Sequence, residues 1–167
     1  MRHAWVRWLL RCGFTAVLLL GLAACAVAPR AASNAQANLW SGRLSLQVQS
    51  EPVQSFSAAF ILEGNSGQGK LTVTSPFGNT LAVAAWEPGK ATLTSGGEIQ
   101  VFASASQLLE RATGAAIPLG GLFDWLAGKA TPVNGWTADL TRFTEGRILA
   151  KRVQPLPESD LRIVLDQ

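Results

Sequence analysis

The sequence predicts an α+β domain in which two short helices cover an antiparallel sheet. Apolar and polar residues alternate along most of residues 40–103 and again after residue 136, a pattern typical of half-buried strands. Between residues 104 and 128 the apolar spacing changes to three and four residues, as in amphipathic helices. The order of strands, helices and strands contains no repeated β-α-β unit, so we expect the sheet to be antiparallel.

Six strands are expected before the helices. The first two have apolar positions of one parity each, namely Trp40, Leu44, Leu46 and Val48, then Phe56, Ala58, Phe60 and Leu62. The next two contain Leu71 and Val73, and Leu81, Val83 and Ala85. The last two cover residues 91–95 and 98–103, and Gly96-Gly97 between them is a strong hairpin signal.

Two helices follow. Ser104 or Ser106 can cap the first, which continues through residue 112 and ends at Gly114. The second begins at Pro118, a residue favoured in a first turn, and ends at Gly128. Its two internal glycines, at 120 and 121, each cost about 1 kcal/mol relative to alanine. This composition fits an ordinary core helix, and it also fits a movable lid over an apolar cavity.

Strand pattern then resumes in three further segments. These are centred on Trp136, Ala138 and Leu140, on Ile148 and Ala150, and on Leu161, Ile163 and Leu165. A turn is expected at Glu145-Gly146 between the first two of them.

Residues 1–24 are interpreted as a lipoprotein signal peptide. Arg2, Arg7 and Arg11 precede an apolar run at residues 14–20, and small residues lead to Leu22-Ala23-Ala24-Cys25. Cleavage between Ala24 and Cys25 would leave Cys25 at the amino terminus, where its thiol carries the lipid. The alternative is an ordinary cleaved signal with an incidental cysteine. Residues 25–38 then form a lipidated tether, and residues 39–167 form one domain.

The composition excludes several function classes. Three of the 14 Lys and Arg residues lie in the signal, so 11 remain against 11 Asp and Glu, and this balance gives no support to nucleic-acid binding. His3 and Cys12 also lie in the signal, which excludes Cys/His metal sites and Ser-His or Cys-His catalytic pairs from the mature chain. The carboxylate pairs Asp139/Glu145 and Glu158/Asp160 lie among turn residues and are interpreted as solvated. We therefore expect no enzyme, cofactor or metal.

One expected turn, at residues 75–79, contains a large aromatic residue, Phe77. Ser75-Pro76-Phe77-Gly78-Asn79 places a large aromatic residue between two expected strands, with proline before it and glycine after it. Phe77 either packs back on a neighbouring strand or points outward as a probe that enters a membrane. Burying such a side chain in lipid contributes roughly 1.5–3 kcal/mol, which suffices for transient contact.

Four segments together resemble one known family. Trp40–Leu44, Phe56–Phe60, Ser75–Thr80 and Gly114–Gly128 occur in the order found in LolB, the family of outer-membrane lipoprotein receptors. The resemblance implies an incomplete antiparallel barrel whose hydrophobic cavity is covered by helices. It also implies that the protein accepts acylated lipoproteins from the periplasmic carrier LolA. In this family an exposed leucine in a Pro-Leu-Gly turn inserts into the membrane, and Pro76-Phe77-Gly78 occupies that place here.

The same resemblance defines the expected site, partners and location. Partners are lipoprotein-loaded LolA, lipoprotein acyl chains and the inner leaflet of the outer membrane, and the protein is expected to be a monomer anchored there and facing the periplasm. Two alternatives remain open: a carrier of acyl ligands without insertion activity, and a structural envelope lipoprotein without a cavity. The residues expected to line the cavity are Phe60, Leu62, Leu71, Trp86, Phe102, Leu119, Leu122, Trp125 and Leu126.

Overall fold

The structure, a computed structural model, describes residues 38–133 and 135–166, and within them the chain forms one open antiparallel sheet with two α-helices. The predicted signal peptide, Cys25 and nearly all of the predicted tether lie outside the described residues. The elements are β1 (Leu39–Val48), β2 (Gln54–Gly64), β3 (Gly69–Thr74), β4 (Thr80–Glu87), β5 (Lys90–Ser95), β6 (Glu98–Phe102), α2 (Ala105–Thr113), α3 (Leu119–Leu126), β7 (Trp136–Asp139), the short 3-10 helix η2 (Phe143–Glu145), β8 (Arg147–Arg152) and β9 (Ser159–Leu165). The predicted fold class is confirmed.

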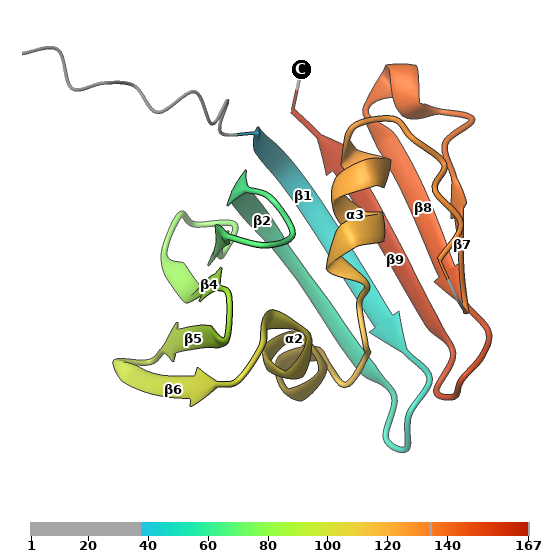
Figure 1. Ribbon diagram of the computed structural model, residues 1–167. Coiled ribbons are helices and arrows are strands. Elements are labelled where there is room, and N and C mark those ends of the chain that lie inside the picture. The colour runs from blue at the N-terminus through green and yellow to red at the C-terminus, as the bar shows by residue number, and fades with distance from the viewer. Residues whose placement is uncertain (1–37, 134, 167) are drawn as a thin grey trace, which may run out of the picture. The chain divides into compact units, whose positions relative to one another are not determined.

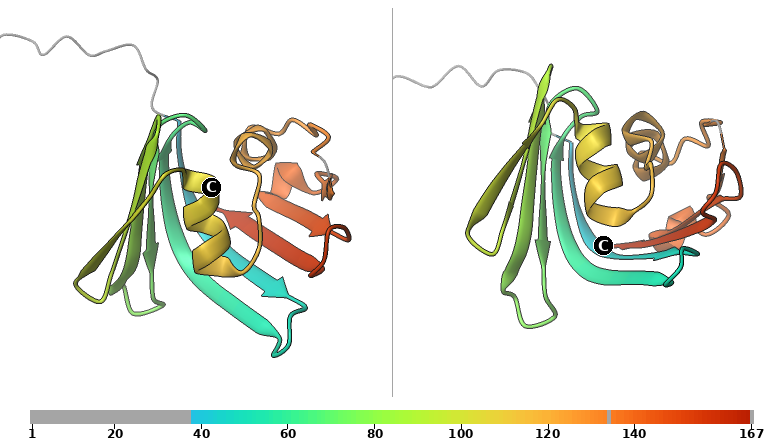
Figure 2. Two further views of the ribbon diagram at one scale, coloured as in Figure 1. Left: turned by 60° about the horizontal axis from the view of Figure 1, so that its bottom comes forward. Right: turned by 90° about the horizontal axis from the view of Figure 1, so that it is seen from below.

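The nine strands of the described region follow the order β6-β5-β4-β3-β2-β1-β9-β8-β7. All neighbours are antiparallel, and β1 lies between β2 and the last strand of the chain, β9. The edge strands β6 and β7 do not pair with each other, so the barrel stays open. Figure 2 shows the sheet curving around one side of α2 and α3, which cover its concave face.

Because consecutive strands are antiparallel, the turns alternate between two ends of the sheet. One end, which we call the Phe77 end, holds the turns at residues 49–53, 75–79, 96–97 and 153–158. The opposite end, the Trp40 end, holds the turns at residues 65–68, 88–89 and 140–146. β1 begins at the Trp40 end, immediately after the expected tether.

The concave face of the sheet forms the core. Leu46 and Val48 of β1, and Phe60 and Leu62 of β2, are buried with the predicted parity. In β4, Ala84 and Trp86 are buried and Ala82 is partly buried against the core, whereas the sequence pattern emphasised Leu81, Val83 and Ala85. Val73 pairs with Ala82 but Thr74 pairs with Thr80, so Leu81 is an extra residue that shifts the register. This bulge reverses the parity that reaches the core.

Both helices begin and end close to the predicted signals. The hydroxyl of Ser104, and not that of Ser106, caps α2 by accepting a hydrogen bond of 3.2 Å from the backbone N–H of Gln107. Gly114 ends α2 with φ of 70°, in the left-handed region that glycine adopts without strain. α3 starts directly after Pro118 and ends at Leu126, two residues before Gly128.

Candidate functional site: an apolar cavity open at the Phe77 end

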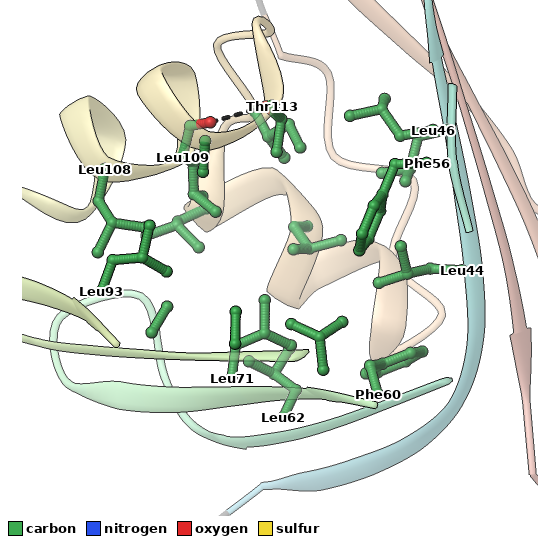
Figure 3. Close-up of a pocket in the computed structure, with 18 of the residues that line it drawn as sticks. Leu44, Leu46, Phe56, Phe60, Leu62, Leu71, Leu93, Leu108, Leu109 and Thr113 are labelled. Carbon is green, nitrogen blue, oxygen red and sulfur yellow. Dashed lines mark hydrogen bonds between the residues drawn. The ribbon is translucent and has the colours of Figure 1, made fainter. Parts of the chain in front are cut away.

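A cavity of about 570 Å³ lies between the concave face of the sheet and the two helices. Figure 3 shows Leu108 and Leu109 of α2 on the side opposite Leu62 and Leu71 of the sheet. The volume is within the range of about 300–1,000 Å³ that is usual for ligand sites. The wall consists of Leu44, Leu46, Val48, Gln54, Ser55, Phe56, Phe60, Leu62, Leu71, Val73, Ala82, Ala84, Trp86, Leu93, Ser95, Leu108, Leu109, Ala112, Thr113, Ile117, Leu119, Leu122, Leu126, Leu161 and Ile163.

The wall is almost entirely apolar. Its only polar members are Gln54, Ser55, Ser95 and Thr113, and none of its residues is ionisable. The Thr113 hydroxyl is already engaged, because it lies 2.7 Å from the carbonyl oxygen of Leu109 in the preceding turn of α2. Such a wall binds a ligand by removing apolar surface from water, and it offers no ionisable group for acid-base chemistry.

The cavity opens at the Phe77 end. The exposed members of its wall are Gln54, Ser55 and Phe56 at the start of β2, Ser95 at the end of β5 and Ala112 in the last turn of α2. We call these five residues the cavity mouth. The end of α2 lies close to the start of β2, because a Cβ at position 114 would be 3.2 Å from Oε1 of Gln54.

At the opposite end of the cavity, the wall residue Trp86 belongs to a cluster of three packed aromatic rings. Phe123 of α3 packs edge-on against Trp40 at 5.4 Å and against Trp86 at 6.3 Å between ring centroids. Both indoles are also held by hydrogen bonds, from Trp40 Nε1 to the carbonyl of Leu126 at 3.1 Å and from Trp86 Nε1 to that of Asn65 at 3.0 Å. We call Trp40, Trp86 and Phe123 the aromatic floor.

Seven of the nine residues expected at the cavity line it in the structure. They are Phe60, Leu62, Leu71, Trp86, Leu119, Leu122 and Leu126. Strand parity places the first four on the concave face, and helical spacing places the last three on one face of α3.

The structure differs from expectation at Trp125 and Phe102, which are absent from the wall. Trp125 lies on a neighbouring face of α3, where its ring is 6.1 Å from that of Trp136 and its indole donates to the carbonyl of Thr131. Phe102 is the last residue of β6, at the Trp40 end, and packs at the edge of the core. Both residues are apolar like the wall residues, but they pack against neighbours outside the cavity.

Sequence reasoning missed the contributions of α2 and β1 to the wall. Leu108, Leu109 and Ala112 lie on the side of α2 that faces the sheet, and a spacing of three and four residues from Leu108 was the available signal. Leu44 and Leu46 were expected to be inward-facing, but their role in the wall depends on the helices that lie opposite. Phe56 was likewise treated only as a strand residue, although it stands at the cavity mouth.

The Phe77 side chain is 90% exposed. The backbone N–H of Gly78 donates to the carbonyl of Ser75 at 2.9 Å, which closes a turn with Pro76 and Phe77 at its centre. Gly78 has φ of +83°, a conformation in which a side chain would be strained. The Phe77 ring therefore points outward and does not pack back on a neighbouring strand.

Two carboxyl groups, those of Asp139 and Glu145, have a lowered pKa. They lie at the Trp40 end, far from the cavity mouth. Hydrogen bonds from the backbone N–H and then the hydroxyl of Thr141 lower the pKa of Asp139. A hydrogen bond from Arg142 is the main cause of the lowered pKa of Glu145. Both carboxyl groups are exposed, and their partners give them a structural role in the turn before β8.

Neither a metal cluster nor a spanning helix is found in the described part of the chain. Within residues 38–133 and 135–166, no three His, Cys, Asp or Glu side chains gather into a group able to hold a metal ion. Among the same residues, no helix has the length and apolar character needed to cross a membrane.

Comparison with known proteins identifies the family. The family model described as outer membrane lipoprotein LolB matches residues 38–165, which include the whole sheet and both helices. The chain belongs to the LolB family. The family that the order of segments suggested is thus confirmed. The cavity and the two helices that cover it lie within the part of the chain that the family model matches.

Individual LolB proteins are similar over most of the chain. The outer-membrane lipoprotein LolB of Bordetella pertussis is 30% identical over 190 residues, covering 97% of this chain and 94% of the relative. That of Bordetella petrii is 28% identical over 187 residues, with 96% and 94% covered. That of Cupriavidus pinatubonensis is 37% identical over 144 residues, with 80% and 69% covered.

Proposed function

We propose that this LolB-family protein receives acylated lipoproteins from the carrier LolA and inserts them into the outer membrane. The observation that carries the proposal is the apolar cavity, which has the aromatic floor at one end and is open at the end that carries Phe77. A receiver of acyl chains needs such a dry concave surface, and it needs no catalytic group.

The direction of transfer has a physical requirement. In a transfer that draws on no external energy source, an acyl chain moves into the cavity only if its free energy there is lower than in the donor. The buried wall residues Leu62, Trp86 and Leu126 favour this, because they offer apolar surface that is shielded from solvent at that end. Release then requires a still more favourable apolar environment at the mouth, which a bilayer supplies.

We propose that the protein is anchored in the outer membrane by lipid on Cys25 after cleavage at Ala24, and that its domain faces the periplasm. The relatives named above are outer-membrane lipoproteins. The turn of Pro76, Phe77 and Gly78 acts as the membrane-inserting element, and the exposed aromatic ring takes the part that leucine has in the family.

A transfer assay tests the proposal. A triacylated lipoprotein labelled with a fluorophore is loaded on LolA, mixed with a Cys25→Ala form of this protein, and then offered liposomes. We expect the label to pass first to this protein and then to the liposomes. Ala84→Phe is the variant designed to fill the cavity and prevent uptake. Ala84 is 4% exposed and lies in the wall between Leu71 and Leu93.

Two results would contradict the proposal. If a folded protein takes no lipoprotein from demonstrably loaded LolA but binds a fluorescent fatty acid, it is a carrier of acyl ligands without receptor activity. If neither ligand binds, or if Ala84→Phe takes up lipoprotein as well as the unmodified protein does, the cavity is not the receiving site.

A further inference from the structure

Exposed apolar side chains are unevenly distributed between the turns at the two ends of the sheet. At the Phe77 end, Val53 is 55% exposed, Phe77 90% and Leu156 74%, and each belongs to a different turn. The turns described at the Trp40 end carry no exposed large hydrophobic residue; their prominent side chains include Asn65, and Arg142 paired with Glu145. Scattered apolar residues are normal on a surface, but their concentration on the turns of one end is not.

Hydrogen bonds hold these apolar tips in place. In the turn of Phe77, the N–H of Ser75 donates to the carbonyl of Asn79 at 2.8 Å. In the turn of Leu156, the Arg152 guanidinium and the Ser159 hydroxyl both donate to the carbonyl of Pro157, at 3.0 and 3.2 Å. Ordered turns therefore hold these apolar side chains in water.

The tips lie on both sides of the mouth residues of β2. The N–H of Gln49 donates to the carbonyl of Glu158 at 2.8 Å, which ties the turn of Val53 to the turn of Leu156. The turn of Phe77 joins β3 and β4, beyond β2 on the other side. The mouth residues on β2 and β5 flank these two strands. Figure 2 shows the turns of this end separated from one another.

We propose that the Phe77 end is a multipoint membrane-contact surface, in which Val53 and Leu156 enter the lipid interface together with Phe77 around the cavity mouth. The inference rests on the proposed function and adds two membrane-contacting turns and an orientation to it. A bilayer is the occupant that fits separate tips, because a broad fluid apolar medium reaches all of them at once. The three turns contain Glu51 and Glu158 but no Lys or Arg, so anionic lipid is not the attraction.

The length of the chain before β1 allows this orientation. Residues 26–38 are 13 residues, which span at most about 43–47 Å. β1, with 10 residues, is about 33 Å long and runs from the Trp40 end to the Phe77 end. A lipid on Cys25 can therefore lie in the same bilayer that the Phe77 end touches, although the chain enters the domain at the opposite end.

Vesicle binding tests the contribution of each tip. The probe is a suspension of phosphatidylcholine vesicles, and the protein is the chain from residue 26 onward, which contains the whole compact unit of residues 36–167. We expect Val53→Ser and Leu156→Ser each to weaken binding by about three- to tenfold, and the triple variant with Phe77→Ser to lose at least about 100-fold. The matched controls are Val101→Ser on β6, 65% exposed, and Leu39→Ser at the Trp40 end, 63% exposed.

The outcomes separate the inference from the proposed function. If Val53→Ser and Leu156→Ser bind vesicles as the unmodified protein does, Phe77 acts alone and the inference is wrong, whatever the transfer assay gives. Equal losses in the two controls would also overturn it. Binding of a fluorescent fatty acid to each variant reports the cavity, and loss of that binding would indicate misfolding or failure of the proposed function instead. Addition of phosphatidylglycerol should not strengthen the contact.

A shortened tether tests the orientation in the lipidated protein. Deletion of residues 31–36 leaves seven residues between Cys25 and β1. These span at most about 25 Å, which is shorter than β1. Cys25 is the only cysteine after residue 24, so Leu156→Cys can be labelled with an environment-sensitive fluorophore. We expect the label to report an apolar environment with the full tether and water with the short one. The same signal with both tethers would overturn the proposed orientation.

Discussion

The indole Nε1 of Trp40, near the start of β1, donates a hydrogen bond of 3.1 Å to the backbone carbonyl of Leu126, the last residue of α3. The two residues are 86 positions apart in the sequence. This bond attaches the end of a covering helix to the sheet at the end of the cavity opposite its mouth. It therefore couples the stability of the aromatic floor to the position of α3.

Replacing Trp40 by phenylalanine should loosen α3. The variant keeps a ring for Phe123 but leaves the Leu126 carbonyl without its donor, which we expect to cost about 1–3 kcal/mol in the free energy of unfolding. Urea unfolding measures the loss, and amide hydrogen exchange in residues 119–126 should become faster. Trp86→Phe is the control, because its indole bonds to Asn65 in a turn rather than to a helix. Equal exchange in α3 of both variants would show that Trp40 does not hold the helix.

The two glycines of α3 should respond oppositely to alanine. A Cβ at Gly121 would lie 2.3 Å from Cγ2 of Val133, so Gly121→Ala should destabilise the protein by about 1–3 kcal/mol through overpacking. A Cβ at Gly120 meets nothing within 4 Å, so Gly120→Ala should stabilise by up to about 1 kcal/mol. Thermal or urea unfolding of the pair checks both signs. A stabilised Gly121→Ala variant would mean that α3 can move away from Val133 without cost.

Substitution of Phe77 should affect release and not uptake. Because the side chain is 90% exposed, Phe77→Glu should change stability by no more than about 0.5 kcal/mol and leave uptake of lipoprotein from LolA unchanged. Delivery to liposomes should fall at least about tenfold, since a charged side chain opposes entry into lipid. Phe77→Leu should retain delivery. Normal delivery by the glutamate variant would exclude a membrane role for this residue.

Binding of a neutral apolar probe should not depend on pH between about pH 5 and pH 8, the interval in which histidine usually titrates. No ionisable residue lines the cavity, and the only histidine of the sequence is His3, in the expected signal. Fluorescence titration of an uncharged acyl probe measures the dissociation constant across this interval. A change of tenfold or more would point to a titrating group that controls the opening of the helices.

Stability, in contrast, should fall in acid. The pKa of Asp139 is lower in the folded protein than in the unfolded chain, because the N–H and hydroxyl of Thr141 bind its carboxylate. Its contribution is thus present above the unfolded pKa of about 3.9 and is lost as pH falls through the lower folded value. Urea unfolding at neutral pH and below about pH 3.9 should show a smaller acid-induced loss for Asp139→Asn than for the unmodified protein. Equal losses would exclude this carboxyl group as a cause.

Local sequence signals predicted much of the fold because they act over a few residues. Ser104 and Gly114 bound α2 through hydrogen bonds and backbone angles of their own segment. The proline and glycine on either side of Phe77 likewise define the turn in which it is exposed. Alternation along β1 and β2 predicted which residues face inward, since a strand without a bulge has only two faces.

Local signals could not predict which face of β4 is buried, or on which side of α3 Trp125 packs. An extra residue at Leu81 changes which face of β4 is buried, and the partner strand β3 determines where that residue is accommodated. Trp125 and Leu126 are adjacent and both apolar, yet one packs towards Trp136 and the other lines the cavity. Local spacing could not distinguish them, because the difference depends on elements that are distant in sequence.

The sequence by itself determined the strand and helix segments, the absence of histidine and of a second cysteine after residue 24, and the position of the turn that contains Phe77. Only the tertiary structure decided that Trp86, at one end of the cavity, packs with Phe123 and Trp40, and that the cavity opens at the end where Val53, Phe77 and Leu156 are exposed. The physical reason is that propensity, capping and alternation are local energies. Which turns share an end, and which rings meet, follows from the register of strands far apart in the chain.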